Sequence, residues 1–290
     1  MTPTPLANGF CFGEGPRWFE GLVWFSDMLG EAVHTVTLGG EMSTLDLAGH
    51  SPSGLGFRPD GTLLIVSTKR RQLLGYDGDS VTTVADLSAL VPADLGDMVV
   101  DRHGCAYVGS EAREGGVIVR VDPGRDGAGR ATVVAGDLDF PNGMAITPDG
   151  ATLIVAESTA RRLTAFTIAA DGSLCERRVF ADDLDGPPDG ICLDDGGGVW
   201  TAMTLAHQFQ RITTANAGDS ATAGGAGDSA TVTDRIDMGD RTAIACALGG
   251  PEGRTLFLLS STDAYPQRLV GTKLSRLDAT IVDVPAAALD

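Results

Sequence analysis

The strongest constraint on the fold is an internal repeat that runs through the chain. Six segments each begin with a small or polar residue, continue as a short alternating stretch, pass through a glycine-containing turn and end in an apolar run. They are residues 14–28, 53–68, 97–110, 142–158, 189–203 and 245–261. Repetition at a nearly fixed spacing is the signature of architectures that stack one supersecondary unit many times. The chain is therefore predicted to contain six copies of one unit.

Each repeat is predicted to be a hairpin of two buried strands. The turns Pro-Asp-Gly at 59–61 and 148–150, and Pro-Glu-Gly at 251–253, have β-turn residues in which glycine supplies a positive φ. The runs LLIV, TLIVA and TLFLL beside these turns are short and apolar, as buried strands are. Most intervals also hold a second strand-like pair, such as VIVRVDP followed by ATVVAG. A unit therefore has four strands.

The spacing of the repeats selects the fold class. Successive repeats start 39, 44, 45, 47 and 56 residues apart, and one four-stranded propeller blade takes about 40–50 residues. We therefore predict an all-β fold, a six-bladed β-propeller of four-stranded antiparallel blades, with residues 1–290 forming a single domain. A TIM barrel is disfavoured because few helical periodicities occur, and two sandwich domains would not give six similar units.

Two further features concern the ring. Closing a propeller usually mixes N-terminal and C-terminal strands in one blade, so Phe10–Phe12 or its neighbours are expected to pair near Thr280–Val284. Residues 213–232 are rich in Gly, Ala, Ser, Thr and Asp, and the sequence AGDSAT occurs there twice. We predict a flexible surface loop between blades five and six.

Composition excludes several classes of function. The chain has 39 acidic and 21 basic residues, a formal net charge of −18, and nucleic-acid binding needs clustered Lys and Arg. No apolar run approaches the ~18 residues of a membrane helix, and the start lacks the basic and apolar regions of a signal peptide. Five cysteines without a CxxC pair indicate reduced thiols. We expect a cytoplasmic monomer or homodimer that acts on a small molecule, without nucleic acid or membrane.

The repeat also predicts a site. The first strand of every propeller blade lines the central channel, so equivalent positions face one axis. These positions are Glu14, Ser53, Asp97, Asn142, Asp189 and Ala245. Three carboxylates close together repel and raise one another's pKa unless a cation neutralises them. Oxygen ligands suit Ca²⁺, Mg²⁺ or Mn²⁺, with Zn²⁺ as an alternative although no ring position is His or Cys. Taken singly, each polar residue could instead cap a strand end.

Three ordered motifs carry a family resemblance that covers residues 9–285. They are Glu14-Gly15-Pro16-x-Trp18 followed by Val23-Trp24-Phe25-Ser26-Asp27, Pro141-Asn142-Gly143-Met144 with Pro148-Asp149-Gly150, and Pro188-Asp189-Gly190 with Val199-Trp200. Together they resemble the regucalcin/gluconolactonase/luciferin-regenerating-enzyme family. The resemblance implies a six-bladed propeller with one divalent metal in its channel, held by Glu14, Asn142 and Asp189. It also implies hydrolysis of sugar lactones or related cyclic esters.

One departure from that family concerns the substrate. Many members have Asn-Asp where this sequence has Gly96-Asp97. The aspartate is retained, but Gly96 lacks the amide that resembles a substrate or metal contact in those relatives. Asp94 lies near the place of a sugar-binding arginine of the animal members. The metal ligands are therefore expected to be intact, while a gluconolactone-type substrate is in question.

The predicted activity is a metal-dependent lactonase reaction. A cation of this kind polarises the lactone carbonyl and lowers the pKa of a bound water. Asp189 is the candidate catalytic base, by the resemblance and by its ring position. Asp97, Ser53 and His207 are the candidate substrate-binding residues. Ca²⁺ is the first choice of metal, with Mg²⁺, Mn²⁺ or Zn²⁺ as alternatives. Hydrolysis of a phosphotriester or other ester, and a non-enzymatic calcium-binding propeller, are the rival functions.

Overall fold

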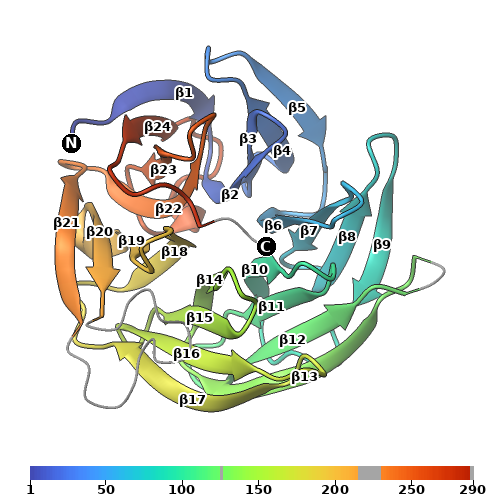
Figure 1. Ribbon diagram of the computed structural model, residues 1–290. Coiled ribbons are helices and arrows are strands. Elements are labelled where there is room, and N and C mark those ends of the chain that lie inside the picture. Colours follow the sequence, from blue (N-terminus) through green and yellow to red (C-terminus); the bar gives the residue numbers. More distant parts are fainter. Residues whose placement is uncertain (125–126, 215–229, 288–290) are drawn as a thin grey trace.

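The protein is a six-bladed propeller in which every blade is a four-stranded antiparallel sheet. The computed structural model describes residues 1–124, 127–214 and 230–287. Its sheets stand around a common axis (Figure 1). The inner strands, one from each blade, are β2 (Gly13–Phe19), β6 (Pro52–Phe57), β10 (Leu95–Val100), β14 (Pro141–Ile146), β18 (Pro188–Leu193) and β22 (Thr242–Gly249). The predicted fold class is confirmed, and the six repeats correspond to the six blades.

The other strands follow outward from the axis in each blade. The second strands are β3 (Leu22–Asp27), β7 (Leu63–Ser67), β11 (Ala106–Ser110), β15 (Thr152–Glu157), β19 (Val199–Met203) and β23 (Thr255–Ser261). The third strands are β4 (Ala32–Val36), β8 (Gln72–Tyr76), β12 (Gly116–Asp122), β16 (Arg162–Ile168), β20 (Gln208–Thr213) and β24 (Ser275–Ile281). The outer strands are β5 (Met42–Asp46), β9 (Val81–Asp86), β13 (Arg130–Leu138), β17 (Leu174–Ala181), β21 (Thr231–Asp237) and β1 (Thr4–Phe10).

The hydrophobic core lies between blades rather than on the axis. Every residue of β7, β11, β15 and β19 is buried, which explains their continuous apolar runs, because both faces of these strands are covered. The described residues form six hydrophobic clusters, and each joins two neighbouring blades. Burial of apolar surface therefore holds the ring together blade by blade, while the axis is left for polar side chains.

The hairpin turns have the predicted chemistry. Gly61, Gly150 and Gly253, the last residues of the three quoted turns, have φ values of 88°, 73° and 67°. The amide of Gly61 donates a 2.9 Å hydrogen bond to the carbonyl of Arg58, and Gly150 bonds Thr147 in the same way at 2.8 Å. Glycine adopts this left-handed conformation without the steric cost of a Cβ atom.

The ring is closed by the N-terminal strand. β1 is the outer strand of the last blade and pairs antiparallel with β24 (Figure 1). Mixed closure is therefore confirmed, but its register is not the predicted one. Thr4 lies opposite Ala279 and Phe10 lies opposite Ser275, so the paired strand ends at Phe10, and its partners lie upstream of Thr280. A pattern of single apolar residues does not fix register when a strand is bulged, and β1 has register shifts at two places.

The low-complexity insertion belongs to a blade and not to a connection between blades. Thr213 ends β20, and Thr231 begins β21, and these two strands pair within blade five. The prediction of a loop between blades five and six was wrong in this respect, and its first and last residues are strand residues. Residues 215–229 lie outside the described part of the chain, so the predicted flexibility is untested.

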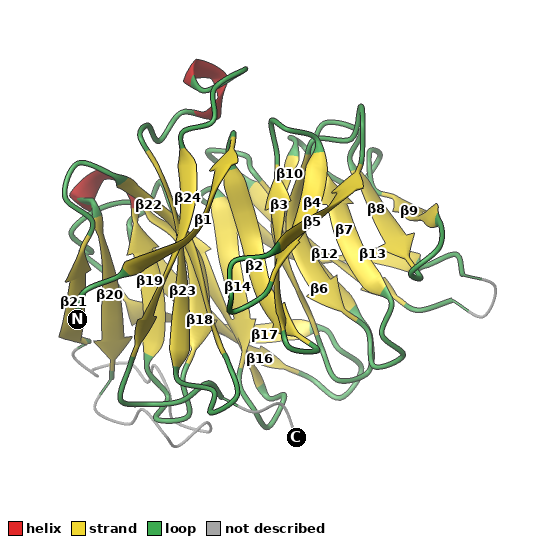
Figure 2. Ribbon diagram, turned by 90° about the horizontal axis from the view of Figure 1, so that it is seen from above, coloured by secondary structure: helices red, strands yellow, loops and turns green. Residues whose placement is uncertain are grey.

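Helix is nearly absent, and its position marks one face of the ring. The described helical segments are two 3₁₀ turns, η1 (Thr204–Ala206) and η2 (Pro266–Arg268). Both lie at the same edge of the molecule when it is viewed along the sheets (Figure 2). Within the described residues, no helix is long and apolar enough to span a bilayer.

Candidate active site at the channel mouth

The inner strands carry a recurring irregularity where the candidate site begins. The antiparallel register shifts between Glu14 and Arg17 in β2, and equivalent shifts occur near the start of the other inner strands. A bulge bends a strand and re-aims its side chains, and bulges are common beside active sites. The predicted ring positions lie in or beside these irregular segments. The repeat therefore places equivalent side chains at one end of the channel.

Glycines after two ring residues let neighbouring blades approach closely. A Cβ atom on Gly143 would lie 2.4 Å from the carbonyl oxygen of Asp189, and one on Gly190 would lie 2.4 Å from the Cβ of Ala245. Both distances are far below van der Waals contact, so any side chain would push the blades apart. The Asn142-Gly143 and Asp189-Gly190 pairs thus combine a polar group with a close backbone contact.

Carboxylates from three alternate blades meet at this end of the channel. Asp97 and Asp189 are 5% and 8% exposed, and Glu14 is partly buried. Burial, followed by the negative charges of Asp189, Asp97 and Glu111, raises the pKa of Glu14 well above its usual value. Burial and the charges of Asp97 and Glu111 do the same to the pKa of Asp189. Removing water and adding like charges both disfavour the ionised form.

One oxygen of this cluster has no partner. Oδ1 of Asp189 is buried and accepts no hydrogen bond from the described residues. The Asn142 side chain bonds Asp189 and lowers its pKa, and Nδ2 of Asn142 also donates to Ser158 Oγ at 3.3 Å. Ser158 in turn donates to the carbonyl of Pro188 at 2.6 Å. With its nitrogen engaged, Asn142 has its carbonyl oxygen left for a ligand. An unsatisfied buried carboxylate oxygen is costly and needs an explanation.

Arg17 is the counter-ion within reach of this cluster. Its guanidinium donates to the carbonyls of Pro16 and Met98 at 2.7 and 2.5 Å, and Nη2 lies 3.4 Å from Asp97 Oδ1. Burial raises the pKa of Asp97, and the charge of Arg17 partly offsets this. Glu14 and Asp189 receive no comparable compensation. The repeat does not predict a role for position 17, because arginine is not repeated at the equivalent position of the other blades.

Glu111 is a site residue that the repeat did not indicate. Burial, Asp94 and Asp97 raise the pKa of its carboxyl to about 8, and its charge acts on Glu14 and Asp189. A Cβ atom on Gly96 would lie 2.8 Å from Glu111 Oε1 and 2.9 Å from its Cγ. The Glu111 side chain therefore occupies the space that a side chain at position 96 would need. The sequence indicates residues 111–116 as a loop over the channel, but no repeat or motif singles out Glu111 within it.

A cavity opens over the cluster on the face that carries η1 and η2. Its volume is about 360 Å³, and Asn142 and Asp189 line it with Phe140, Ser158, Thr204 and Tyr265. A volume of this order suits a small-molecule site. Of the candidate substrate contacts, Ser53 is buried in β6. His207 follows η1 with φ of 56° and a buried, unpartnered Nδ1, while its neighbours Thr204 and Leu205 line the cavity.

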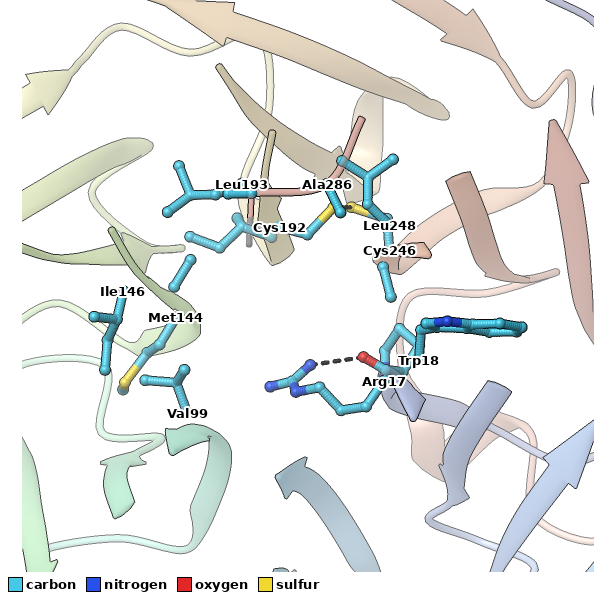
Figure 3. Close-up of a pocket in the computed structure, with 15 residues that line it drawn as sticks. Arg17, Trp18, Val99, Met144, Ile146, Cys192, Leu193, Cys246, Leu248 and Ala286 are labelled. Carbon is cyan, nitrogen blue, oxygen red and sulfur yellow. Dashed lines mark hydrogen bonds between the residues drawn. The ribbon is translucent and has the colours of Figure 1, made fainter. Parts of the chain in front are cut away.

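A second cavity lies further along the same channel. It has a volume of about 230 Å³ and is lined by later residues of the inner strands and by Ala286. Arg17 projects into it among Met144, Cys192 and Leu248 (Figure 3). The thiols of Cys192 and Cys246 are 3.6 Å apart there, and both are free. Arg17 thus stands between an acidic channel mouth and an apolar interior.

The donor set at the mouth fits a hard divalent cation. Within the described ranges, no three His, Cys, Asp or Glu side chains are arranged to hold a metal ion. The candidate set is two carboxylates and one amide, namely Glu14, Asn142 and Asp189, so it does not meet that description. All its donors are oxygen atoms, as Ca²⁺ and Mg²⁺ prefer. The unpartnered Oδ1 of Asp189 and the raised pKa of both carboxyls also fit a site that binds a positive charge.

Comparison with known proteins agrees with this geometry. Residues 12–262 match the family model described as the SMP-30/Gluconolactonase/LRE-like region. The chain belongs to the SMP-30/gluconolactonase/LRE-like family. The resemblance drawn from the three motifs is thereby confirmed. The match covers all of the ring positions and most of the six blades.

Individual members of the SMP-30/gluconolactonase/LRE-like family are similar over much of the chain. A 6-deoxy-6-sulfogluconolactonase of Pseudomonas putida is 28% identical over 289 residues, covering 95% of this chain and 93% of the relative. Pentonolactonase XacC of Haloferax volcanii is 26% identical and covers 70% of each chain. The structure of a calcium-binding regucalcin from Agrobacterium tumefaciens superposes with a TM-score of 0.73 at 20% identity, covering 99% of this chain and 95% of that one.

Proposed function

We propose that this protein hydrolyses a lactone, a sugar lactone or a related cyclic ester, at the mouth of the propeller channel. The observation that carries the proposal is the buried, unpartnered Oδ1 of Asp189 beside Asn142 in a cavity of small-molecule size. Two relatives that cover most of the chain are named as lactonases, which supports the same reaction class.

The proposal includes a divalent cation held by Glu14, Asn142 and Asp189. When bound, such a cation supplies Lewis-acid polarisation of a carbonyl oxygen and lowers the pKa of water. Ca²⁺ is the first candidate because a structural neighbour is named as calcium-binding, and oxygen ligands also accept Mg²⁺ or Mn²⁺. Zn²⁺ is the least favoured because the set contains neither His nor Cys.

The protein's own groups then have separate tasks in the reaction. Asp189 accepts the proton of the water whose oxygen attacks the lactone carbonyl carbon. It returns this proton to the ring oxygen as the ring C–O bond breaks, which gives the hydroxyl group of the opened acid. Ser158 holds the Asn142 amide in place through its hydrogen bond.

Asp97 and Arg17 are proposed to orient the substrate. The Arg17 guanidinium fixes Asp97 from the side of the channel interior, so the carboxylate can accept a hydrogen bond from a substrate hydroxyl without moving. Ser53 and His207 keep their predicted role as substrate contacts only if the substrate reaches blade two and the segment after η1.

The test is hydrolysis of a lactone panel followed by pH indicator. The chelated protein is assayed alone and after addition of Ca²⁺, Mg²⁺, Mn²⁺ or Zn²⁺, beside Asp189→Ala and Glu14→Gln. Glu252→Gln is the matched control, since Glu252 is an exposed carboxylate of the β22–β23 turn. Turnover restored by a cation and lost in both site variants, but not in the control, is the expected result. Cation binding without turnover of any lactone would overturn the proposal and favour a non-enzymatic propeller.

A further inference from the structure

Two arginines line the cavity together with the proposed catalytic residues. Arg113 lies in the segment that joins β11 to β12, and Arg161 lies in the turn that joins β15 to β16. They come from blades three and four, whereas Asp189, the carboxylate that lines the cavity, comes from blade five. The cavity therefore has Asn142 and Asp189 on the side of the channel and two arginines at its rim.

The backbone fixes where both arginines stand. The amide of Phe140 donates a 2.8 Å hydrogen bond to the carbonyl of Ala112, which ties the Arg113 segment to blade four. Arg161 has a left-handed φ of 52°. Its amide donates to Ser158 at 3.3 Å, and its carbonyl accepts from Leu184 at 3.2 Å. The rim is thus anchored to Ser158, the residue that holds Asn142, although both arginine side chains are exposed.

Neither guanidinium is engaged by another part of the protein. Among residues 1–124, 127–214 and 230–287, no hydrogen bond or ion pair of the Arg113 or Arg161 side chain is found. The next residue shows the contrast, because Arg162 bonds Glu157 at 2.8 Å and Asp139 at 3.5 Å. In a chain with a net charge of −18, acidic partners for arginine are abundant. Two arginines without one in the same cavity are available to a ligand.

We infer that the substrate is an anionic lactone, whose carboxylate, phosphate or sulfonate group binds Arg113 and Arg161 at the rim while its ring carbonyl faces Asp189. This rests on the proposed function and adds the substrate class. Guanidinium groups bind oxyanions through charge-assisted, often paired hydrogen bonds. The two guanidinium groups lie at the rim, so they hold the anionic group there and leave the ring of the lactone beside Asp189.

The two arginines at the cavity also offset the long-range repulsion between this acidic protein and an anionic substrate. An acidic protein repels an anionic substrate at long range, and local cationic groups at a cavity mouth restore attraction where it is needed. A cavity of about 360 Å³ accommodates a monosaccharide-sized lactone. A neutral lactone would use only the side of Asn142 and Asp189 and leave both guanidinium groups in water.

The experiment compares neutral and charged lactones in charge-removal variants. Gluconolactone and its phosphate-bearing and carboxylate-bearing analogues are assayed with the cation-loaded protein and with Arg113→Gln, Arg161→Gln and the double variant. For the charged lactones we expect kcat/KM to fall roughly tenfold per arginine, mainly through KM, since charge-assisted hydrogen bonds are lost. For gluconolactone the change should stay below about twofold.

Arg130→Gln is the matched control. Arg130 is exposed at the start of β13, the outer strand of blade three, and no hydrogen bond or ion pair of its side chain is found in the described chain. It makes the same change in net charge away from the cavity, so its kinetics should equal those of the unmodified protein. Added salt should raise KM for the charged lactones in the unmodified protein and much less in the double variant.

The outcomes separate this inference from the proposed function. Hydrolysis of gluconolactone with no preference for charged analogues, or equal loss for neutral and charged lactones in the arginine variants, would overturn the anionic class alone. Absence of turnover on every lactone with every cation would overturn the proposed function and the substrate class together. A preference for only the phosphate-bearing or only the carboxylate-bearing analogue would support the inference and name the anion.

Discussion

Glu157 and Asp189 are two buried carboxylates on neighbouring blades, and their surroundings are opposite. Glu157, fully buried at the end of β15, accepts hydrogen bonds from Arg162 at 2.8 and 2.9 Å and from Arg177 at 3.0 and 3.1 Å. The Asp139 amide donates at 2.8 Å, and Thr164 donates as well. Despite its burial, these partners lower the pKa of Glu157 to about 2.

Asp189 is nearly as buried and lacks such partners. Its Oδ1 is unpartnered, and burial with the charges of Asp97 and Glu111 raises its pKa. The fold can neutralise a buried carboxylate with arginines, as blade four shows, but within the described residues it does not do so for Asp189. The comparison indicates that Glu157 stabilises the fold, whereas the carboxylate of Asp189 is available to bind a ligand.

The largest expected effect comes from neutralising the unpartnered carboxylate. Asp189→Asn should lower kcat/KM for lactone hydrolysis roughly a thousandfold, because the proposed base is removed. The chelated variant should unfold at a urea concentration no lower than the unmodified protein, since a buried uncompensated charge disappears. Activity assays and urea unfolding measure the two effects. A stability loss of several kcal/mol would show that Asp189 is structural, as Glu157 is.

The second-largest expected effect is a loss of stability without a loss of activity. Glu157→Gln should lower the free energy of unfolding by about 3 kcal/mol, since the folded pKa lies well below the usual value and two arginines lose their partner. The contribution of Glu157 is present above about pH 4.5 and is lost as the pH falls toward about 2. Urea unfolding between pH 7 and pH 3 should therefore show a steeper loss in the unmodified protein. Activity per folded molecule should be unchanged in the variant, and a large loss would contradict the assignment.

A cation should distinguish the two carboxylates directly. At a hundred times its dissociation constant, Ca²⁺ should stabilise the chelated protein by about 2.7 kcal/mol. The increase in melting temperature should persist in Glu157→Gln and disappear in Asp189→Asn. Differential scanning fluorimetry across Ca²⁺, Mg²⁺, Mn²⁺ and Zn²⁺ provides the measurement. If none of the four ions shifts either protein, the unpartnered oxygen does not mark a cation site.

The smallest expected effect tests how closely the acidic region is packed. Gly96→Ala should destabilise the protein by about 1 kcal/mol, because its Cβ would lie 2.8 Å from Glu111 Oε1 and displace that flexible side chain. In a Glu111→Ala background the same substitution should be nearly neutral. Urea unfolding of the four proteins forms a double-mutant cycle. Equal costs in both backgrounds would mean that Glu111 does not fill the space beside Gly96.

The sequence predicted the features that recur in all six blades, but it did not predict the site residues that occur in one blade alone. Six similar segments predicted six blades, and equivalence of their first positions predicted that Glu14, Asp97, Asn142 and Asp189 would share one end of the channel. Whether these residues bind metal and substrate stays a prediction. Glu111, Arg17 and Ser158 contact the same region with side chains that are not repeated at the equivalent positions of the other blades. Their roles depend on distances across blades, which no periodicity encodes.

Two details of the fold could not be predicted from the sequence, for a related reason. The interval of 56 residues before the last repeat showed that something is inserted, but an interval between inner strands does not say which of the intervening connections is enlarged. Likewise, the expectation of mixed ring closure followed from topology, whereas its register depends on two irregularities in β1. Composition identifies the loop and the strand. Only the pairing of strands in the folded protein shows which connection holds the loop and in which register the strand pairs.

The closing strand also has a consequence for how the protein is made. β1 is synthesised before the other strands of the propeller, and its partner β24 is synthesised after them. During translation the backbone N–H and C=O groups of β1 therefore lack their partners until β24 has been made. Pro5 and Gly9 in this strand, together with its irregular pairing, make it a poor template for the wrong partner. Proline and bulges in an edge strand disfavour pairing with a second chain.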